Sequence, residues 1–388
     1  MTKRANTIKT GLTFDDVLLI PNRTSARSRK DINLATNLTA KIKLNSPIIS
    51  ANTPWCTESD LATVMAKMGG IGFVHRMTTM EIQAEEVQKV KSAKVDLVKY
   101  PLASIDQEGR LLVGAAIGIK GDYLDRSEKL VNNGVDVLII DIAHGHSDYI
   151  IEPIMNLKER YPDIDIIAGN VATMNGVRDL AEAGVNAIKV GIGPGGICTT
   201  RQVAGAGVPQ LTAIMDCAEE ASKYGLPIIA DGGMRSSGDM TKALAAGASC
   251  VMLGSLLAGT DESAALLVDE GGTKYKITTG FVTFGVSLSL KLLEKRAITK
   301  EELSDYVPEG VESTFEYQGP AVDVMKQYLG GIRSGISYAG GLDIPGLVQN
   351  ANFISVTPSG RSENTPHAHT RSSQVHPDYR ESVVGSEI

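Results

Sequence analysis

Cys198 and the glycine-rich segment before it carry the residue types best suited to chemistry. Residues 191–201 read GIGPGGICTTR. Such glycines let a ligand approach the backbone, whose carbonyls can hold a monovalent cation and whose amides can hold a phosphate. Two threonines and Arg201 follow the cysteine, and a nearby cation favours the thiolate, which is the nucleophilic form. The residues alone leave two interpretations open: a cysteine nucleophile in a binding loop, or a plain structural turn.

Two other short segments, each following an apolar run, suit a phosphorylated ligand. Residues 231–233 read DGG and residues 254–255 read GS. In barrel enzymes phosphate commonly binds to backbone amides in the last two loops after the strands. The carboxylate of Asp231 at a strand end suits ribose hydroxyls. The alternative is that these glycines only turn the chain.

Other polar residues near predicted strand ends are less decisive. Asp141 could contact the ribose or nicotinamide of a cofactor, or it could cap a helix. His144 and His146 flank a glycine, but no carboxylate cluster completes a site there, so a metal is disfavoured. We interpret His75 as a structural histidine.

Short apolar runs alternate with amphipathic stretches along the chain, which predicts an α/β protein. Several runs are continuously apolar, as in parallel strands buried on both faces. Eight such units predict a single (β/α)8 TIM barrel, and a doubly wound open sheet is the alternative. The polar segments described above occupy loops after strands, where barrels place their active sites. The predicted strands are 47–50, 71–74, 113–117, 135–140, 164–168, 187–190, 227–230 and 250–253, and the predicted helices include 79–91, 123–132, 174–183, 211–224 and 238–245.

Composition and charge exclude several classes of partner. The 388 residues have a net charge of −7 without a Lys/Arg run, so we expect neither nucleic acid nor an anionic membrane as a partner. No apolar stretch reaches ~18 residues and the first residues lack the core of a signal peptide, which predicts a cytoplasmic protein. The four cysteines form no CxxC pair and are expected to be thiols.

The segment 266–320 breaks the alternation of strands and helices. It is rich in Lys, Thr and Ser, and a long insertion of this kind predicts a mobile flap over the site. We assign residues 1–370 to one catalytic barrel domain with this flap, and residues 371–388 to a C-terminal tail.

Many motifs together resemble the IMP dehydrogenase / GMP reductase family. The resemblance spans residues 11 to about 370, and its motifs fall on the predicted barrel loops. They include GLTFDDVLLIP (11–21), GGIGFVH (69–75), DIAHGHS (141–147), AGN (168–170), GIGPGGICTTR (191–201), GVPQLTAI (207–214), ADGGMRSSGD (230–239), VMLGS (251–255) and GGIRSGISYAGG (330–341).

The resemblance implies roles for individual residues. It makes Cys198 the nucleophile that attacks C2 of a purine nucleoside monophosphate, with Thr200 and Glu309 as the acid/base pair. It makes Asp231 the ribose ligand. The phosphate contacts would come from Gly196, Gly233, Gly254 and Ser255.

The resemblance also implies cofactors and assembly. NADPH or NAD would lie beside Asp141 and Gly191. Backbone carbonyls of Gly193, Gly195 and Cys198 resemble a potassium site. Family members are commonly homotetramers. The dehydrogenases' cystathionine-synthase-like (CBS) modules are expected to be missing, because only a short stretch, 93–107, follows the second helix.

The direction of the reaction is predicted by departures from the dehydrogenase pattern. Dehydrogenases activate water with an Arg-Tyr pair about 13 residues before the catalytic glutamate, whereas this chain has Arg296 followed by Ala297. The YRGMGS segment that binds the base is replaced by residues 277–287. These departures favour a GMP reductase, which converts GMP and NADPH to IMP, ammonia and NADP.

Other features keep alternatives open. GVPQLTAI and the segment 362–369 resemble IMP dehydrogenases, which convert IMP, NAD and water to XMP and NADH. Gly196 replaces the family's phosphate-binding serine, and TPWC (53–56) replaces Met-Asp-Thr-Val. An enzyme for a modified purine nucleotide, or a non-catalytic nucleotide sensor, therefore remains a further hypothesis.

Overall fold

Eight parallel strands close into a barrel at the centre of the molecule. The structure is a computed structural model that describes residues 8–278, 288, 291, 295–304, 307 and 310–364. Pairing runs in chain order around the barrel, and the last strand pairs with the first, so the sheet is closed. The (β/α)8 prediction is confirmed. The strands are β4 (Ile48–Ser50), β5 (Ile71–Val74), β6 (Val113–Ile117), β7 (Val137–Asp141), β8 (Asp165–Val171), β9 (Ala187–Val190), β10 (Ile228–Asp231) and β11 (Cys250–Leu253).

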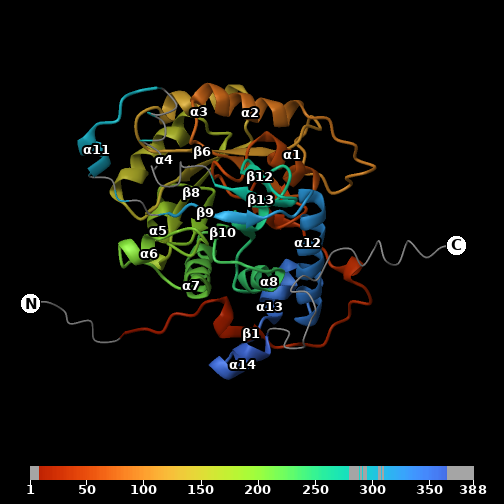
Figure 1. Cartoon of the computed structure of the whole chain (residues 1–388). Coiled ribbons are helices and arrows are strands. Elements are labelled where there is room, and N and C mark those ends of the chain that lie inside the picture. The colour runs from red at the N-terminus through yellow and green to blue at the C-terminus, as the bar shows by residue number, and fades with distance from the viewer. Residues whose placement is uncertain are drawn as a thin grey trace, which may run out of the picture.

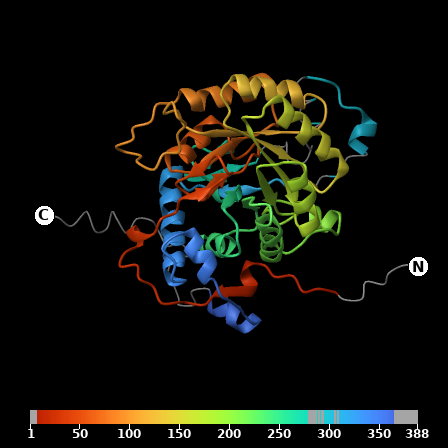
Figure 2. The same cartoon turned by 180° about the vertical axis from the view of Figure 1, so that it is seen from behind.

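Helices surround the strands, as Figures 1 and 2 show from opposite sides. The longer ones are α1 (Ser59–Lys67), α2 (Met80–Ser92), α3 (Tyr123–Asn132), α4 (Asp148–Arg160), α5 (Met174–Glu182), α7 (Gln210–Ser222), α8 (Ser237–Ala245) and α12 (Ala321–Tyr338). The short ones are α6 (Thr200–Val203), α9 (Ser255–Ala258), α11 (Lys300–Ser304), α13 (Ile344–Asn350) and α14 (Pro358–Glu363), with 3-10 turns Phe14–Asp16 and Arg29–Asp31. Among the described residues, no helix has the length and apolar character needed to span a membrane.

Glycines in α12 explain how closely this helix packs against α8. A Cβ on Gly331 would lie 2.1 Å from Oγ of Ser237, and a Cβ on Gly335 would lie 2.5 Å from Cγ2 of Thr241. Only glycine leaves enough room at these two positions. The GGIRSGIS motif is therefore explained by helix packing.

The hydrophobic core has two layers separated by the barrel strands. The inner layer fills the barrel with residues such as Ile49, Phe73 and Ile139, all fully buried. The outer layer lies between the strands and the surrounding helices. A short hairpin, β2 (Thr36–Asn37) and β3 (Lys43–Leu44), adds Leu44 to the inner layer.

A small antiparallel sheet stands outside the barrel. It orders β12 (Leu266–Glu270), β13 (Thr273–Ile277) and β14 (Thr314–Glu316) side by side. The sequence pattern did not predict these strands, because their side chains are mostly exposed. The central part of the predicted flap, and the tail 371–388, lie outside the described residues. A second small sheet pairs β1 (Val17–Leu19) with β15 (Phe353–Ser355).

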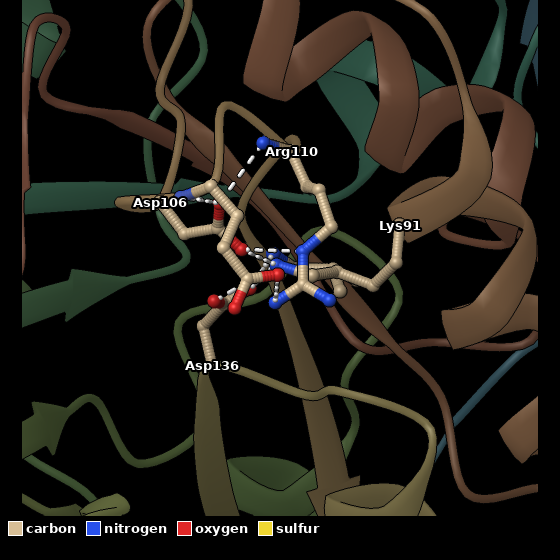
Figure 3. A network of polar contacts seen from close by, with 6 residues as sticks. Lys91, Asp106, Arg110 and Asp136 are labelled. Atoms are coloured by element: carbon tan, nitrogen blue, oxygen red, sulfur yellow. Dashed lines mark hydrogen bonds and ion pairs between the residues drawn. The ribbon is translucent and has the colours of Figure 1, made fainter.

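A buried lysine ties together the amino-terminal ends of β6 and β7 (Figure 3). The side chain of Lys91, 5% exposed, places Nζ 2.9 Å from Oδ2 of Asp106 and 2.9 Å from Oδ2 of Asp136. Asp136 also accepts a hydrogen bond from the amide of Val113 at 2.8 Å, and Asp106 accepts one from Nε of Arg110 at 2.9 Å. This network anchors the connection between α2 and β6, whose residues form turns and an isolated bridge.

We predict that Asp106→Asn lowers the free energy of unfolding by about 1–3 kcal/mol at pH 7, because it removes charge-assisted hydrogen bonds. Burial alone would raise the pKa of Asp106, but hydrogen bonds from Lys91 and Arg110 lower it to about 2, below the ordinary value of 3.8. The contribution is therefore present above about pH 4 and is lost as the pH falls through about 2. Urea unfolding of both proteins at pH 7 checks this, and equal midpoints and slopes would contradict it.

Candidate active site

A cavity of about 510 Å³ opens at the carboxyl-terminal ends of the barrel strands. Its walls come from the segments after β4, β5, β9, β10 and β11, with Asp141 at the end of β7. Most of the predicted site residues line it together: Asp141, Gly195, Gly196, Cys198, Asp231, Gly233, Gly254 and Ser255. Glu309 lies outside the described residues, but the next residue, Gly310, lines the cavity.

Cys198 sits at the end of the β9 loop, just before α6. Its Sγ lies 3.1 Å from Oγ1 of Thr200, the first residue of that helix. The amide of Cys198 donates to the carbonyl of Gly195 at 3.1 Å, which closes the loop. Gly310 forms an antiparallel bridge with Cys198. The thiol and the threonine hydroxyl, predicted to act together, are thus neighbours, although Cys198 lines the cavity and Thr200 does not.

Arg201 contacts the backbone of the loop that leads to Cys198 and of the segment that follows. Its guanidinium donates to the carbonyls of Ile192, at 3.0 Å, and Val208, at 2.6 Å. A Cβ on Gly193 would lie 2.6 Å from the Arg201 side chain, so this glycine (φ +73°) allows the close contact. Arg201 therefore fixes the shape of the loop through its backbone.

Cys198 is the partly exposed cysteine of the four, and the other three are buried. Burial raises the pKa of Cys56 to about 11 and that of Cys217 to about 12. Burial raises the pKa of Cys250 as well. These three thiols stay protonated at neutral pH and are poor nucleophiles.

Three loops meet at one corner of the cavity with little side-chain bulk between them. Gly232 and Gly233 both have φ +82°, and a Cβ on Gly233 would lie 3.1 Å from Pro194. A Cβ on Gly196 would lie 3.5 Å from Oγ of Ser255, at the start of α9. Backbone groups at such a helix start suit an anionic group. This corner fits the predicted phosphate position.

Buried charges lie beneath the cavity at the ends of four neighbouring strands. Lys189 in β9 places Nζ 2.7 Å from Oδ1 of Asp141 and 2.5 Å from Oδ2 of Asp231. Asn52 donates to Oδ2 of Asp141, and Asn170 donates to Oδ2 of Asp231, each at 2.9 Å. The carboxylates therefore form one connected network.

The pKa values of this network favour its charged form. Burial would raise the pKa of Asp141, but the charge and hydrogen bond of Lys189, with Arg76 and Asn52, lower it overall. Burial would lower the pKa of Lys189, but Asp141 and Asp231 raise it overall. We did not predict a role for Lys189 from the sequence. The indication was a lysine inside a four-residue strand that is otherwise apolar.

Gly191 and Gly193 lie in the same loop but do not line the cavity. The carbonyl of Gly191 accepts Nδ2 of Asn170 at 2.7 Å, and a Cβ on Gly191 would lie 2.3 Å from the carbonyl oxygen of Asp231. Gly191 therefore packs against the strand end that carries the predicted ribose ligand.

The histidines do not form a metal centre in the part of the chain that the structure describes. Nε2 of His146 lies 2.9 Å from Oδ2 of Asp179, on the surface. The ring of His144 lies beside it, with 6.2 Å between ring centroids. His75 is buried, and its Nδ1 accepts the amide of Met77 at 3.1 Å, which fits the structural interpretation.

Trp55, the single tryptophan of the chain, lines the cavity. Its ring stacks on Phe315 of β14, with centroids 5.3 Å apart. A Cβ on Gly254 would lie 3.0 Å from the indole ring. Trp55 thus connects the small sheet to the phosphate corner, and its fluorescence can report on ligands there.

We predict that iodoacetamide at pH 7.5 alkylates Cys198 well before the other cysteines of the folded protein, because only this thiol borders the cavity. Peptide mass spectrometry of timed samples measures the order. Cys198→Ala provides the control and is expected to stay largely unmodified. Equally fast alkylation of Cys217 in the native protein would contradict the prediction.

Comparison with known proteins identifies the family. Residues 11–367 match the sequence model of the IMP dehydrogenase / GMP reductase domain. Inosine-5′-monophosphate dehydrogenase from Nitrosopumilus maritimus is 40% identical over 468 aligned positions, covering 92% of this chain and 98% of that protein. The alignment is longer than this 388-residue chain, so that relative has insertions with no counterpart here.

Reductases are similar to the chain as well. GMP reductase from Leishmania donovani is 36% identical, covering 93% of this chain and 97% of that protein. A crystal structure of a variant GMP reductase from Trypanosoma brucei, in complex with guanosine 5′-monophosphate, superposes with a TM-score of 0.88 at 33% identity, covering 95% of this chain and all of that one. The chain therefore belongs to the IMP dehydrogenase / GMP reductase family of oxidoreductases.

Proposed function

We propose that this protein is a GMP reductase that works through a covalent bond between Cys198 and C2 of the purine. The observation that carries the covalent step is the 3.1 Å contact between Cys198 Sγ and Thr200 Oγ1 at the cavity wall. A thiol that lines the cavity and has a hydroxyl beside it suits attack on a bound nucleotide.

The nucleotide would be oriented by the two ends of the cavity. Gly196, Gly233, Gly254 and Ser255 would bind the phosphate through backbone amides and the serine hydroxyl. Asp231 would accept hydrogen bonds from the ribose hydroxyls. The base would then lie beside Cys198, because that residue borders the same cavity.

The proposed reaction has two steps at C2 of GMP. The Cys198 thiolate forms a bond to C2, and the exocyclic amino group leaves as ammonia after receiving a proton. Thr200 and Glu309 would handle this proton. A hydride then replaces the sulfur at C2, so the C–S bond breaks and returns the thiolate. The products are IMP, ammonia and the oxidised cofactor.

The nicotinamide cofactor supplies the hydride when bound. Asp141 would hold its ribose or nicotinamide side, since this carboxylate lines the cavity and is kept charged by Lys189. Gly191, which does not line the cavity, would contribute only by allowing its loop to pack closely against the end of β10. Potassium is a further proposal: the carbonyls of Gly193, Gly195 and Cys198 belong to one tight loop, and backbone carbonyls suit this ion. A homotetramer is proposed from the family alone.

Ala297 supports the reductase direction. Its methyl group cannot take part in activating water as the tyrosine of dehydrogenases would, and it is exposed beside Arg296. IMP dehydrogenase is the second candidate. It is favoured by the higher identity, 40%, to a dehydrogenase than the 36% to a reductase.

Absorbance at 340 nm in two parallel assays tests the direction. One contains GMP with NADPH, and the other contains IMP with NAD and potassium. We expect absorbance to fall in the first assay and stay constant in the second. A rise in the second alone would establish a dehydrogenase and contradict the reductase proposal.

We predict that Cys198→Ala abolishes turnover, at least ~10³-fold, while GMP still quenches or enhances Trp55 fluorescence with a similar dissociation constant. The reason is that the phosphate and ribose contacts do not involve the sulfur. Turnover within tenfold of the wild-type rate would rule out the covalent mechanism.

A further inference from the structure

Lys189 is a buried cation placed between the two halves of the proposed site. Its side chain is 4% exposed, and Nζ contacts one oxygen each of Asp141 and Asp231. Asp231 is the proposed ribose ligand, whereas Asp141 is on the proposed cofactor side. The lysine is thus the direct link between the two carboxylates.

Each carboxylate also accepts a hydrogen bond from the side-chain amide of an asparagine. Asn170 and Lys189 both donate to Oδ2 of Asp231. Asn52 donates to Oδ2 of Asp141, while Lys189 takes Oδ1. Oδ1 of Asp231 is therefore the oxygen turned away from Lys189 and Asn170, and Asp231 lines the cavity. The arrangement holds the carboxylate while leaving one oxygen for a ligand.

Without the ammonium, two partly buried carboxylates would face each other, Asp141 with 30% and Asp231 with 21% of the side chain exposed. Like charges that share a partly desolvated site repel each other. Each carboxylate would then turn away or take up a proton. Either change would displace the groups that receive the nucleotide and the cofactor.

We propose that Lys189 is a positioning residue shared by both half-sites, which holds Asp231 for the nucleotide ribose and Asp141 for the cofactor. This inference rests on the proposed function, since it takes the ligands of both carboxylates from it. Lys189 itself touches neither ligand. Its effect on one half-site reaches the other through the shared ammonium.

The chain contains a matched control at the opposite end of the barrel. Lys91 is also a buried lysine, 5% exposed at its side chain, and it also bridges two aspartates. Asp106 and Asp136 lie before the amino-terminal ends of β6 and β7 (Figure 3), and neither residue lines the cavity. Lys91→Met thus removes a similar buried ion bridge without touching the site.

The experiment compares Lys189→Met, Lys91→Met and the double variant Asp141→Asn/Lys189→Met. GMP dissociation constants come from Trp55 fluorescence, cofactor KM comes from turnover in whichever direction is active, and thermal unfolding checks folding. The double variant removes one negative charge together with the positive one, so Asp231 no longer faces a second carboxylate.

We expect Lys189→Met to weaken GMP binding at least about tenfold and to raise the cofactor KM by a similar factor. The double variant should bind GMP at least about fivefold more tightly than Lys189→Met, while its cofactor KM stays raised. Lys91→Met should lower the unfolding temperature but leave GMP affinity within about twofold. If Lys189 had only a structural role, the double variant would not recover GMP affinity while its cofactor KM stayed raised.

Two results would overturn the inference. One is a folded Lys189→Met that binds GMP within twofold of the wild type, and the other is a double variant with no recovery. If Lys189→Met does not fold, the double variant is compared with the wild type instead, and a folded double variant with a cofactor KM within twofold of the wild type would overturn it. Wild-type protein that binds neither GMP nor IMP would refute the proposed function itself, and the inference with it.

Discussion

Closure of the parallel barrel is the constraint on which the rest of the structure depends. Because β7, β8, β9 and β10 are neighbours that run in one direction, their carboxyl ends deliver Asp141, Asn170, Lys189 and Asp231 to one small region. These residues are up to 90 positions apart in the chain. The loops that follow the strands then form the cavity directly above this charged layer. Strand order thus determines which residues meet at the site, and the individual side chains determine its chemistry.

Each end of the barrel has a buried lysine that bridges two aspartates, and the two bridges serve different purposes. At the amino-terminal end, Lys91 and its two aspartates hold a connection between α2 and β6. At the carboxyl-terminal end, Lys189 and its two aspartates form the floor of the cavity. This division agrees with the general arrangement of barrel enzymes, in which one face carries stability and the other carries chemistry.

Sequence patterns could predict the barrel because its strands are short, continuous apolar runs between helices. The strand ends were less predictable. We predicted a strand at 135–140, whereas β7 begins at Val137 and ends at Asp141, because Asp136 pairs with Lys91. The glycine loops and Cys198 were identified from local residue types. We could not predict the backbone contacts of Arg201 or the contacts of Lys189 with carboxylates 48 and 42 residues away. Both depend on tertiary packing.

The central claim is that Cys198 bonds covalently to a purine nucleotide, and trapping tests it most directly. The protein is incubated with 2-chloroinosine 5′-monophosphate, whose chloride at C2 the thiolate can displace, and its intact mass is measured. The account predicts one adduct per chain, located at Cys198 by peptide mapping, protected by excess GMP and lost in Cys198→Ala. No adduct on folded protein that still binds GMP would contradict the account and would favour a non-catalytic nucleotide sensor.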